Sequence, residues 1–488
     1  MDKTQLIKEF IALYGGDESD VRVFASPGRV NLIGEHVDYN GGYVFPAALT
    51  MGTTIAVRKR DDRILRMKAT DLDGIVEANL DTPELYKDLF WGNYQVGVAV
   101  ELEKAGYEVV GCDMLYDDTL PHGGGLSSSA AIEVATALTL ATFSNEKKGI
   151  TEPVDMIEMA VIGQRAENKY IGVNCGIMDQ FASAMGKKNH CLFLDCKDLS
   201  YKVLPLNIDG YKIVIANTNK KRSLADSKYN ERRAECDASL EALRTVLPGQ
   251  EYLGTIPVDV FEKHKSVIGD EIKIKRATHV VYECDRVLRS IDALENNDVM
   301  EFARLINGSG DSLKDLYEVT GIELDTLVAE ARKIDGCIAA RMTGAGFGGC
   351  TVNIVREDAI EEFKEKVQIL TLNAQGLGAT KISNIVGIPV NNIKSFLRRA
   401  DIKRTKVEEG VCLYCQKPLE QPPHHRKKRF CGAVCRMRWW NEHQQLVKRN
   451  AYYDFICPHC GKKFTAYGND HRVYCSRKCY ADARRKNG

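Results

Sequence analysis

The sequence predicts an α+β fold in which two unlike parts share one chain. The first observation is a loop of three glycines between a strand-like segment, 112–116, and a run of helix formers, 130–143. The second is a split in charge: residues 1–367 contain 43 Lys and Arg against 59 Asp and Glu, whereas residues 368–488 contain 24 against 8. The third is a repeated cysteine spacing near the C-terminus. Together they predict a large acidic part followed by a small basic part.

The composition is that of a globular protein, with 44% hydrophobic residues among 488. No run of about 18 apolar residues is present, so no membrane span is expected. Residues 1–5 contain no apolar signal-peptide core. We therefore expect a cytoplasmic protein whose thiols are reduced.

A polar loop, 27–42, follows the first predicted elements, a helix over 3–14 and a strand over 21–25. It carries four charged or titratable residues between glycines: Arg29, Glu35, His36 and Asp38. Such a segment is too polar for a core. Carboxylates accept hydrogen bonds, and imidazole donates or accepts them. The cluster therefore predicts a site that binds the hydroxyl groups of a sugar. A solvated polar loop is the alternative.

The glycine-rich loop leads from the predicted strand into the next helix. Backbone N–H groups at such a helix start point at one place, and the helix dipole adds about half a positive charge there. This arrangement suits a polyphosphate, with the hydroxyl of Ser128 or Ser129 available to Mg²⁺. It is not a Walker A loop, because no Gly-Lys-Ser/Thr follows. A turn that merely caps the helix is the alternative.

Later residues continue the α+β pattern. Glu167 lies in a predicted helix ahead of the loop that contains Asp179, and Tyr229 follows a buried-strand pattern. The remaining predicted elements are helices over 91–104 and 357–367 and strands over 213–216 and 351–355.

Four of these segments, taken in order, resemble the GHMP small-molecule kinases. Residues 28–42 resemble the galactokinase signature, and residues 123–131 resemble the second family motif. Residues 176–181 resemble the segment with the catalytic Asp, and residues 341–350 the C-terminal glycine motif. The resemblance implies a two-lobed kinase fold with an N-terminal domain over 1–205 and a C-terminal domain over 206–367. Val37 is a departure, because galactokinases usually have Thr there.

The resemblance also implies an activity, the phosphorylation of α-D-galactose at its C1 hydroxyl by ATP. Asp179 is then the catalytic carboxylate and Arg29 its partner, while Ser129 and Glu167 hold Mg²⁺. Sugar selection falls to Glu35, His36, Asp38 and Tyr229. The ATP site comprises Gly123, Gly124, Gly125, Leu126, Ser127, Ser128 and Ser129.

The resemblance stops near Val367. Galactokinases continue to a closing strand of the C-terminal lobe, and no such strand is recognisable here. We therefore expect a truncated lobe with an exposed sheet edge.

Residues 368–406 show the spacing of a helix-turn-helix. A helix over 379–385 meets a turn at 387–389, and a second helix starts at Asn391. The side chains expected to face a major groove are Asn391, Asn392, Lys394 and Ser395. The segment resembles the DNA-binding region of sigma-factor-like proteins, and a plain helical hairpin is the alternative.

Two cysteine modules complete the chain, over 407–450 and 451–488. The first contains Cys412, Cys415, Cys431 and Cys435, and the second contains Cys457, Cys460, Cys475 and Cys479. These spacings predict two structural Zn²⁺ ions, one in each module. The layout resembles bacterial zinc-ribbon or treble-clef proteins. Nearby histidines are alternative ligands or are solvated: His424, His425, His459 and His471.

Basic and aromatic residues alternate in the first module, as in 426–430 and 436–440. This pattern predicts binding to duplex DNA, with packing within the module as the alternative role of the paired Trp residues. The sequence thus predicts a galactokinase-like enzyme fused, without a linker, to a zinc-dependent DNA-binding tail. The alternatives are a galactose- and ATP-sensing regulator, or a nearly inactive kinase lobe carried by a DNA-binding protein.

Overall fold

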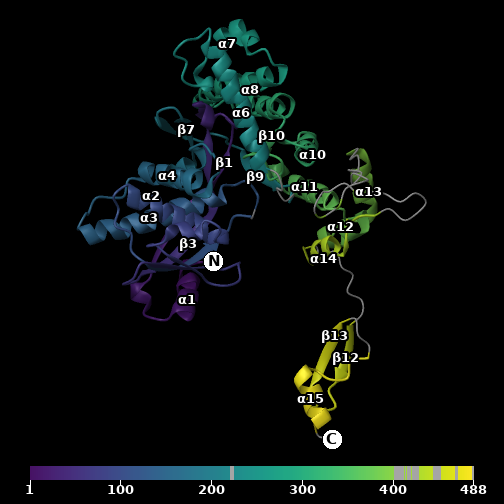
Figure 1. The fold of residues 1–488 in the computed structure, drawn as a ribbon. Helices are drawn as coiled ribbons and strands as arrows, with labels where there is room; N and C mark the ends of the chain where they lie inside the picture. Colours follow the sequence, from purple (N-terminus) through teal and green to yellow (C-terminus); the bar gives the residue numbers. More distant parts are fainter. Residues whose placement is uncertain are drawn as a thin grey trace. The chain divides into compact units, whose positions relative to one another are not determined.

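The computed structural model describes residues 1–121, 123–219, 225–400, 428–442, 452–467 and 471–485, together with Cys412, Tyr414 and Leu419. The chain forms two compact units, residues 1–402 and 403–488, which are coloured along the sequence in Figure 1.

The N-terminal part of the first unit is built on a five-stranded sheet of order β1-β3-β6-β4-β5. Only the β4–β6 pair is parallel. The strands are β1 (Arg22–Asn31), β3 (Pro46–Lys59), β6 (Cys112–Asp118), β4 (Ile64–Ala69) and β5 (Val76–Asn79).

Alternating side chains of β3 separate the two faces of this sheet. Ile55 and Val57 point into the main core, whereas Ala56 points to the opposite face. Four helices cover the faces: α2 (Asn93–Lys104), α3 (Ser128–Lys148) and α4 (Met156–Arg165) on the first, and α1 (Lys3–Tyr14) on the second. The predicted helix over 3–14 is thus present.

Two smaller antiparallel sheets lie in the same unit. One has the order β2-β7-β8, from β2 (Tyr43–Val44), β7 (His190–Asp195) and β8 (Tyr201–Pro205). The other has the order β10-β11-β9, from β10 (Cys337–Thr343), β11 (Cys350–Arg356) and β9 (Tyr211–Asn217). Helix α5 (Met178–Met185) precedes β7.

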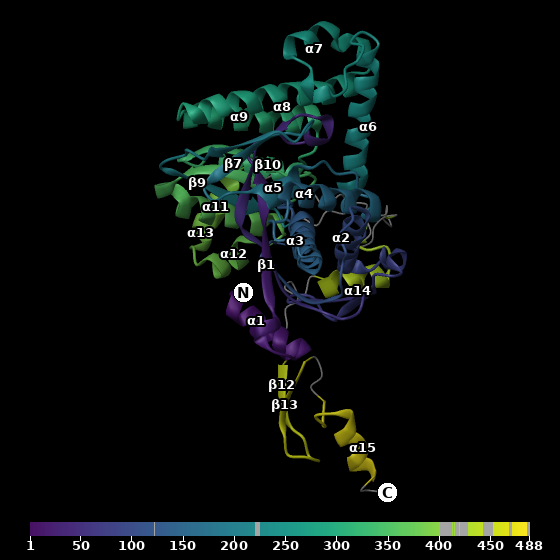
Figure 2. The ribbon, with the colours of Figure 1, turned by 90° about the vertical axis from the view of Figure 1, so that its left-hand side faces the viewer.

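Helices dominate the stretch between β9 and β10. They are α6 (Ala225–Arg244), α7 (Val258–His264), α8 (Glu271–Glu295), α9 (Val299–Ser312) and α10 (Ile322–Ala331). Figure 2 shows α8 and α9 side by side. The short 3-10 turns are η1 (Glu18–Asp20), η2 (Asp38–Asn40), η3 (Pro83–Tyr86), η4 (Phe90–Gly92), η6 (Leu253–Thr255), η7 (Lys265–Ile268) and η9 (Glu357–Ala359), and the π-helical segments are η5 (Ala166–Ile171) and η8 (Leu313–Tyr317).

The three-stranded sheet ends at β9 and β10, and no further strand pairs with either among the described residues. Side chains occupy the outer edge of β10. The Asn307 amide donates to the Ile338 carbonyl at 2.9 Å and accepts from the Ala340 N–H at 3.0 Å, and Arg332 Nε donates to the Ala340 carbonyl at 3.1 Å. At the other edge, no strand of the described part of the chain pairs with β9.

The last helices of the first unit are α11 (Ile360–Ala374), α12 (Ala379–Val386) and α13 (Val390–Arg399). Helix α11 runs through 368–372, beyond the end of the predicted helix. The buried Ile369, Ile382 and Ile393 form a small core shared by the three helices. Phe396 of α13 also packs against the cluster that contains Phe363 of α11. The described part of the predicted helix-turn-helix segment thus packs against the rest of the first unit.

The second unit contains α14 (Ala433–Glu442), β12 (Tyr452–Ile456), β13 (Lys463–Tyr467) and α15 (Arg477–Arg485). The two strands pair antiparallel, and the stacked rings of Phe455 and Phe464 lie 5.5 Å apart. Among the described residues, none of the helices in either unit is both long and apolar enough to cross a membrane.

Candidate active site

A cavity of about 390 Å³ opens in the first unit, which is large enough for a small ligand. It is lined by every site residue that the sequence predicts before position 368: Arg29, Glu35, His36, Asp38, Gly123, Gly124, Gly125, Leu126, Ser127, Ser128, Ser129, Glu167, Asp179 and Tyr229. Gly344 and Ala345 of the third glycine motif line it as well. The structure therefore brings all four predicted motifs to one place.

Arg29 and Asp179 form a bidentate ion pair. Nε and Nη2 of Arg29 each donate to one carboxylate oxygen of Asp179 at 2.9 Å, and Nη1 donates to the Gly125 carbonyl at 2.8 Å. Arg29 is buried on β1, and Asp179 is partly exposed at the start of α5. Burial lowers the pKa of Arg29, but the Asp179 and Glu35 carboxylates more than offset it, so the guanidinium stays charged.

The glycine-rich loop presents three consecutive hydroxyls to three carboxylates. Ser127 Oγ donates to Asp179 Oδ2 at 2.7 Å, and Ser129 Oγ lies 3.5 Å from Glu167 Oε1. Ser128 Oγ donates to Asp118 at the end of β6. Ser127 itself adopts a left-handed conformation, with φ 62°, as the residue that precedes α3. The strand end, the loop and the helix start are therefore tied to the ion pair.

The third glycine motif packs directly against this loop. A Cβ atom on Gly344 would lie 2.7 Å from the Gly125 carbonyl oxygen, and Gly344 has φ 87°, which L side chains rarely adopt. Only glycine fits this close approach of two loops.

Glu167 lies in the π-helical segment η5, a geometry that is frequent at functional sites. Burial, followed by repulsion from Asp179, raises the pKa of Glu167 to about 7. A divalent cation at this position would relieve that repulsion. The oxygen atoms of Ser129 and Glu167 are also the ligand type that Mg²⁺ prefers, so these residues fit a magnesium site.

Glu35 is fixed between the first and third motifs. Its Oε1 accepts hydrogen bonds from Arg341 Nη2 at 2.8 Å, Thr343 Oγ1 at 3.1 Å and the Gly344 N–H at 2.7 Å. Glu35 and Arg341 are both buried. One oxygen of this carboxylate is thus committed to the protein.

Aromatic residues hold His36. Its Nδ1 lies 3.0 Å from the hydroxyl of Tyr39, which lies 2.8 Å from the hydroxyl of Tyr317. The rings of His36 and Tyr229 are 5.5 Å apart. Burial lowers the pKa of His36 to about 3, so the imidazole is neutral.

Asp38 faces the same cavity. Burial and the charge of Asp179 raise its pKa to about 7. A Cβ atom on Gly176 would lie 1.9 Å from Asp38 Oδ2, so a side chain at position 176 would displace this carboxylate.

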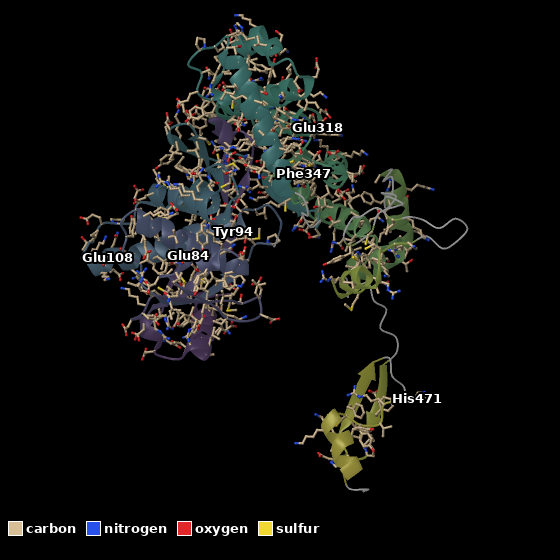
Figure 3. The ribbon with its side chains drawn as sticks, in the orientation of Figure 1. Glu84, Tyr94, Glu108, Glu318, Phe347 and His471 are labelled. Atoms are coloured by element: carbon tan, nitrogen blue, oxygen red, sulfur yellow. The ribbon has the colours of Figure 1, made fainter. Side chains whose placement is uncertain are left out.

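The sequence did not single out several residues of the site. Tyr94, labelled in Figure 3, lines the cavity from the start of α2. Cys175 lines it too, with Sγ 3.5 Å from Glu167 Oε2. Gln180 and Glu133 lie behind Glu167. No spacing rule indicates these residues, because their roles depend on which helices meet.

The predicted zinc ligands also cluster. The sulfur atoms of Cys457, Cys460, Cys475 and Cys479 all lie within 4.8 Å of one another, as do those of Cys412, Cys431 and Cys435. Cys415 lies outside the described residues, as do His424 and His425. Both groups can hold a metal ion.

Three family models match the first unit. The galactokinase galactose-binding signature matches residues 8–59, the GHMP kinases N terminal domain matches 93–187, and the GHMP kinases C terminal matches 290–370.

Curated relatives match about three quarters of the chain and nearly all of their own length. The galactokinase of Clostridium beijerinckii is 50% identical over 372 residues, covering 75% of this chain and 93% of the relative. The galactokinase of Fusobacterium nucleatum is 48% identical over 386 residues, covering 78% and 97%.

Solved structures of small-molecule kinases are also similar to this chain. The crystal structure of Lactococcus lactis galactokinase complexed with galactose has a TM-score of 0.71 and 41% identity, over 79% of this chain and 95% of that one. The Methanococcus jannaschii mevalonate kinase, at 18% identity and a TM-score of 0.51 over 71% and 94%, shares the fold.

Proposed function

Because this chain belongs to the galactokinase family of GHMP kinases, we propose that it transfers the γ-phosphoryl group of ATP to the C1 hydroxyl of α-D-galactose. The observation that carries the proposal is the bidentate pair of Arg29 and Asp179. This pair lies in a cavity that joins the phosphate-type loop to the polar residues of the galactokinase signature. The galactose complex of the Lactococcus lactis relative supports this sugar as the acceptor.

Asp179 accepts the proton of the sugar hydroxyl in this mechanism. As the bond between the sugar oxygen and the γ-phosphorus forms, the bond from that phosphorus to the bridging oxygen of ADP breaks. Arg29 and Ser127 hold the Asp179 carboxylate by three hydrogen bonds, which fixes its orientation before the sugar arrives. Arg29 also places a buried positive charge beside the transferring phosphoryl group.

The nucleotide phosphates lie against the loop from Gly123 to Ser129, at the N-terminus of α3. Ser129 and Glu167 would hold Mg²⁺, which would neutralise phosphate charge there. Ser128 contributes to phosphate binding through its backbone N–H, because its hydroxyl is already hydrogen-bonded to Asp118.

The sugar lies against Glu35, His36, Asp38 and Tyr229. Because a site built on hydroxyl hydrogen bonds leaves its own polar groups unpaired when a hydroxyl is missing, it rejects deoxy analogues strongly. A neutral His36 can accept or donate one such bond, according to its tautomer.

The test is galactose-dependent ADP release from MgATP by the purified chain and by Asp179→Ala. Loss of the proton acceptor predicts a turnover at least about 10²-fold lower, with galactose affinity within a few fold of wild type. Asp335→Ala, a change at an exposed carboxylate, should behave as wild type.

Near-normal turnover of Asp179→Ala would contradict the assignment. Retained galactose binding without turnover in the wild-type chain would favour the sensing regulator. Loss of both in the wild-type chain would indicate an inactive kinase lobe.

The cysteine clusters support two structural Zn²⁺ ions in the second unit, one per module. Each module is too small to bury a sufficient core without a metal or another crosslink. The described residues of the second module already gather four sulfur atoms.

A second function, duplex DNA binding, is supported by the surface of α13. Asn391, Asn392 and Lys394 are exposed on this helix, whereas Ile393 is buried against α11 and α12. Three of the four side chains predicted to face a major groove are therefore exposed, and the fourth, Ser395, is partly buried.

If this surface and the basic tail contact phosphates, the affinity for a fluorescently labelled DNA duplex falls as the salt concentration rises. We expect a loss of roughly tenfold or more between low and moderate salt, measured by anisotropy. The Lys394→Ala variant should bind more weakly with a shallower salt dependence. Salt-independent binding would contradict this function.

A further inference from the structure

The side chain of Gln180 joins two carboxyl groups on different helices. Its Nε2 lies 2.9 Å from Glu133 Oε2 and 2.8 Å from Glu167 Oε2. A side-chain amide has two N–H donors, and here each carboxyl group takes one. Gln180 comes from α5, Glu133 from α3 and Glu167 from η5, so three helical segments meet at this amide.

The junction is buried and closely packed. Gln180 and Glu133 have no exposed surface, and neither lines the cavity. Gly163 of α4 leaves room for them, because a Cβ there would lie 3.2 Å from Gln180 Cγ and 3.3 Å from Glu133 Cβ. The amide therefore has little freedom to turn away from its two partners.

The two oxygens of Glu167 have different surroundings. Oε2 is held by Gln180 and lies 3.5 Å from Cys175 Sγ, whereas Oε1 lies toward Ser129 Oγ. A carboxylate fastened through one oxygen presents the other in a fixed direction. In Glu167 that direction is toward the hydroxyl with which it would share a cation.

We propose that Gln180, supported by Glu133, is a positioning residue that orients Glu167 for Mg²⁺ binding. The inference rests on the proposed function, in which Glu167 and Ser129 hold the ion. Outer partners of metal ligands typically change metal affinity by about 10–100-fold.

Glu133 acts as an anchor rather than as a further ligand. Its Oε2 is taken by Gln180, and its Oε1 has no hydrogen-bond partner among the described residues. Burial and the nearby Glu167 raise the pKa of Glu133 well above its usual range, which disfavours its charged form.

The experiment measures Mg²⁺ binding by calorimetry, by titrating Mg²⁺ into the protein saturated with the non-hydrolysable analogue adenylyl imidodiphosphate. Gln180→Met keeps the length of the side chain and removes the amide. We expect a 10–100-fold weaker Mg²⁺ affinity, with unchanged galactose affinity and unchanged affinity for the analogue in EDTA.

The matched control is Ser183→Ala, which changes another buried polar residue of α5 whose hydroxyl makes no hydrogen bond among the described residues. It should bind Mg²⁺ as the wild type does. Glu133→Gln keeps an acceptor for the Gln180 amide and should also retain affinity, whereas Glu133→Met should lose it.

An Mg²⁺ affinity of Gln180→Met that matches Ser183→Ala would overturn the proposal and leave Gln180 as packing only. If Gln180→Met does not fold, equal Mg²⁺ affinities of Glu133→Met and Glu133→Gln would overturn it instead. The outcome is separate from that of the proposed function. If Mg²⁺ binding depends on Gln180 but the chain shows no galactose-dependent turnover, the positioning role of Gln180 is sustained and the proposed galactokinase function is contradicted.

Discussion

The ionisation of Asp38 links the candidate sugar site to stability. Its pKa is about 7 in the folded protein because burial and Asp179 disfavour the charged form, and the ordinary value is near 4. The folded state therefore keeps a proton that the unfolded chain releases. The resulting stabilisation is fully present below about pH 4 and is lost as the pH rises through about 7.

The direction of this pH dependence predicts how Asp38→Asn differs from the wild type, because the Asn side chain has no proton to lose in this pH range. Between about pH 6 and about pH 8.5, the free energy of unfolding of the wild type should fall by about 1 kcal/mol relative to the variant. Urea denaturation without sugar or nucleotide measures the difference. Asp335→Asn, at an exposed carboxylate, is the control. A pH-independent difference between wild type and Asp38→Asn would contradict the prediction.

At this scale the sequence located residues better than it located contacts. Arg29 and Glu35 were found because unusual polar residues stand between glycines, and Asp179 was found because residues 176–181 resemble the kinase segment with the catalytic Asp. The hydrogen bond of Ser128 to Asp118 was not foreseen, because it depends on where β6 ends relative to the loop. Gln180 follows Asp179 directly, yet its partners come from two other helical segments.

Helices α11, α12 and α13 pack together at the end of the first unit. The sequence predicts a helix ending near 367 and a separate pair of helices. In the structure α11 continues to Ala374, and Ile369 buries its side chain against Ile382 and Ile393. A period of 3.6 residues predicts that such helices form, but not which neighbour covers each apolar face.

Ile382 and Ile385 offer a matched pair on α12. Ile382 is fully buried, whereas Ile385 is 54% exposed. Truncation of a buried Ile to Ala typically costs about 2–5 kcal/mol. We expect Ile382→Ala to speed amide hydrogen exchange in α12 and α13 strongly, and Ile385→Ala to change it little. Equal exchange in the two variants would show that the three helices do not share a core.

The molecule as a whole consists of two units that depend on different forces. The first unit has several apolar clusters, whereas among the described residues of the second the buried side chains are two cysteines, Cys412 and Cys457. The sequence predicted this division from charge and cysteine spacing, because both are compositional signals. It did not predict that 368–400 would pack with the first unit.

Zinc removal should therefore affect one unit only. We expect two zinc ions per purified chain by elemental analysis, and one in Cys460→Ser, because loss of one thiolate opens a four-sulfur site. Cys196→Ser, in the first unit, should keep both. Chelation followed by excess Mg²⁺ should leave galactose-dependent turnover unchanged. A zinc-free wild-type chain would contradict the assignment, and lost turnover would contradict the independence of the units.

The ion pair of Glu35 with Arg341 has a consequence for synthesis, because its members stand 306 positions apart. A ribosome adds about 5–20 residues per second, so Arg341 is made roughly 15–60 s after Glu35. Until then the nascent chain has no partner to fix this carboxylate. If Glu35 selects the sugar as proposed, selectivity is acquired late in translation, and a transcript broken before the codon for Arg341 should yield no selective product.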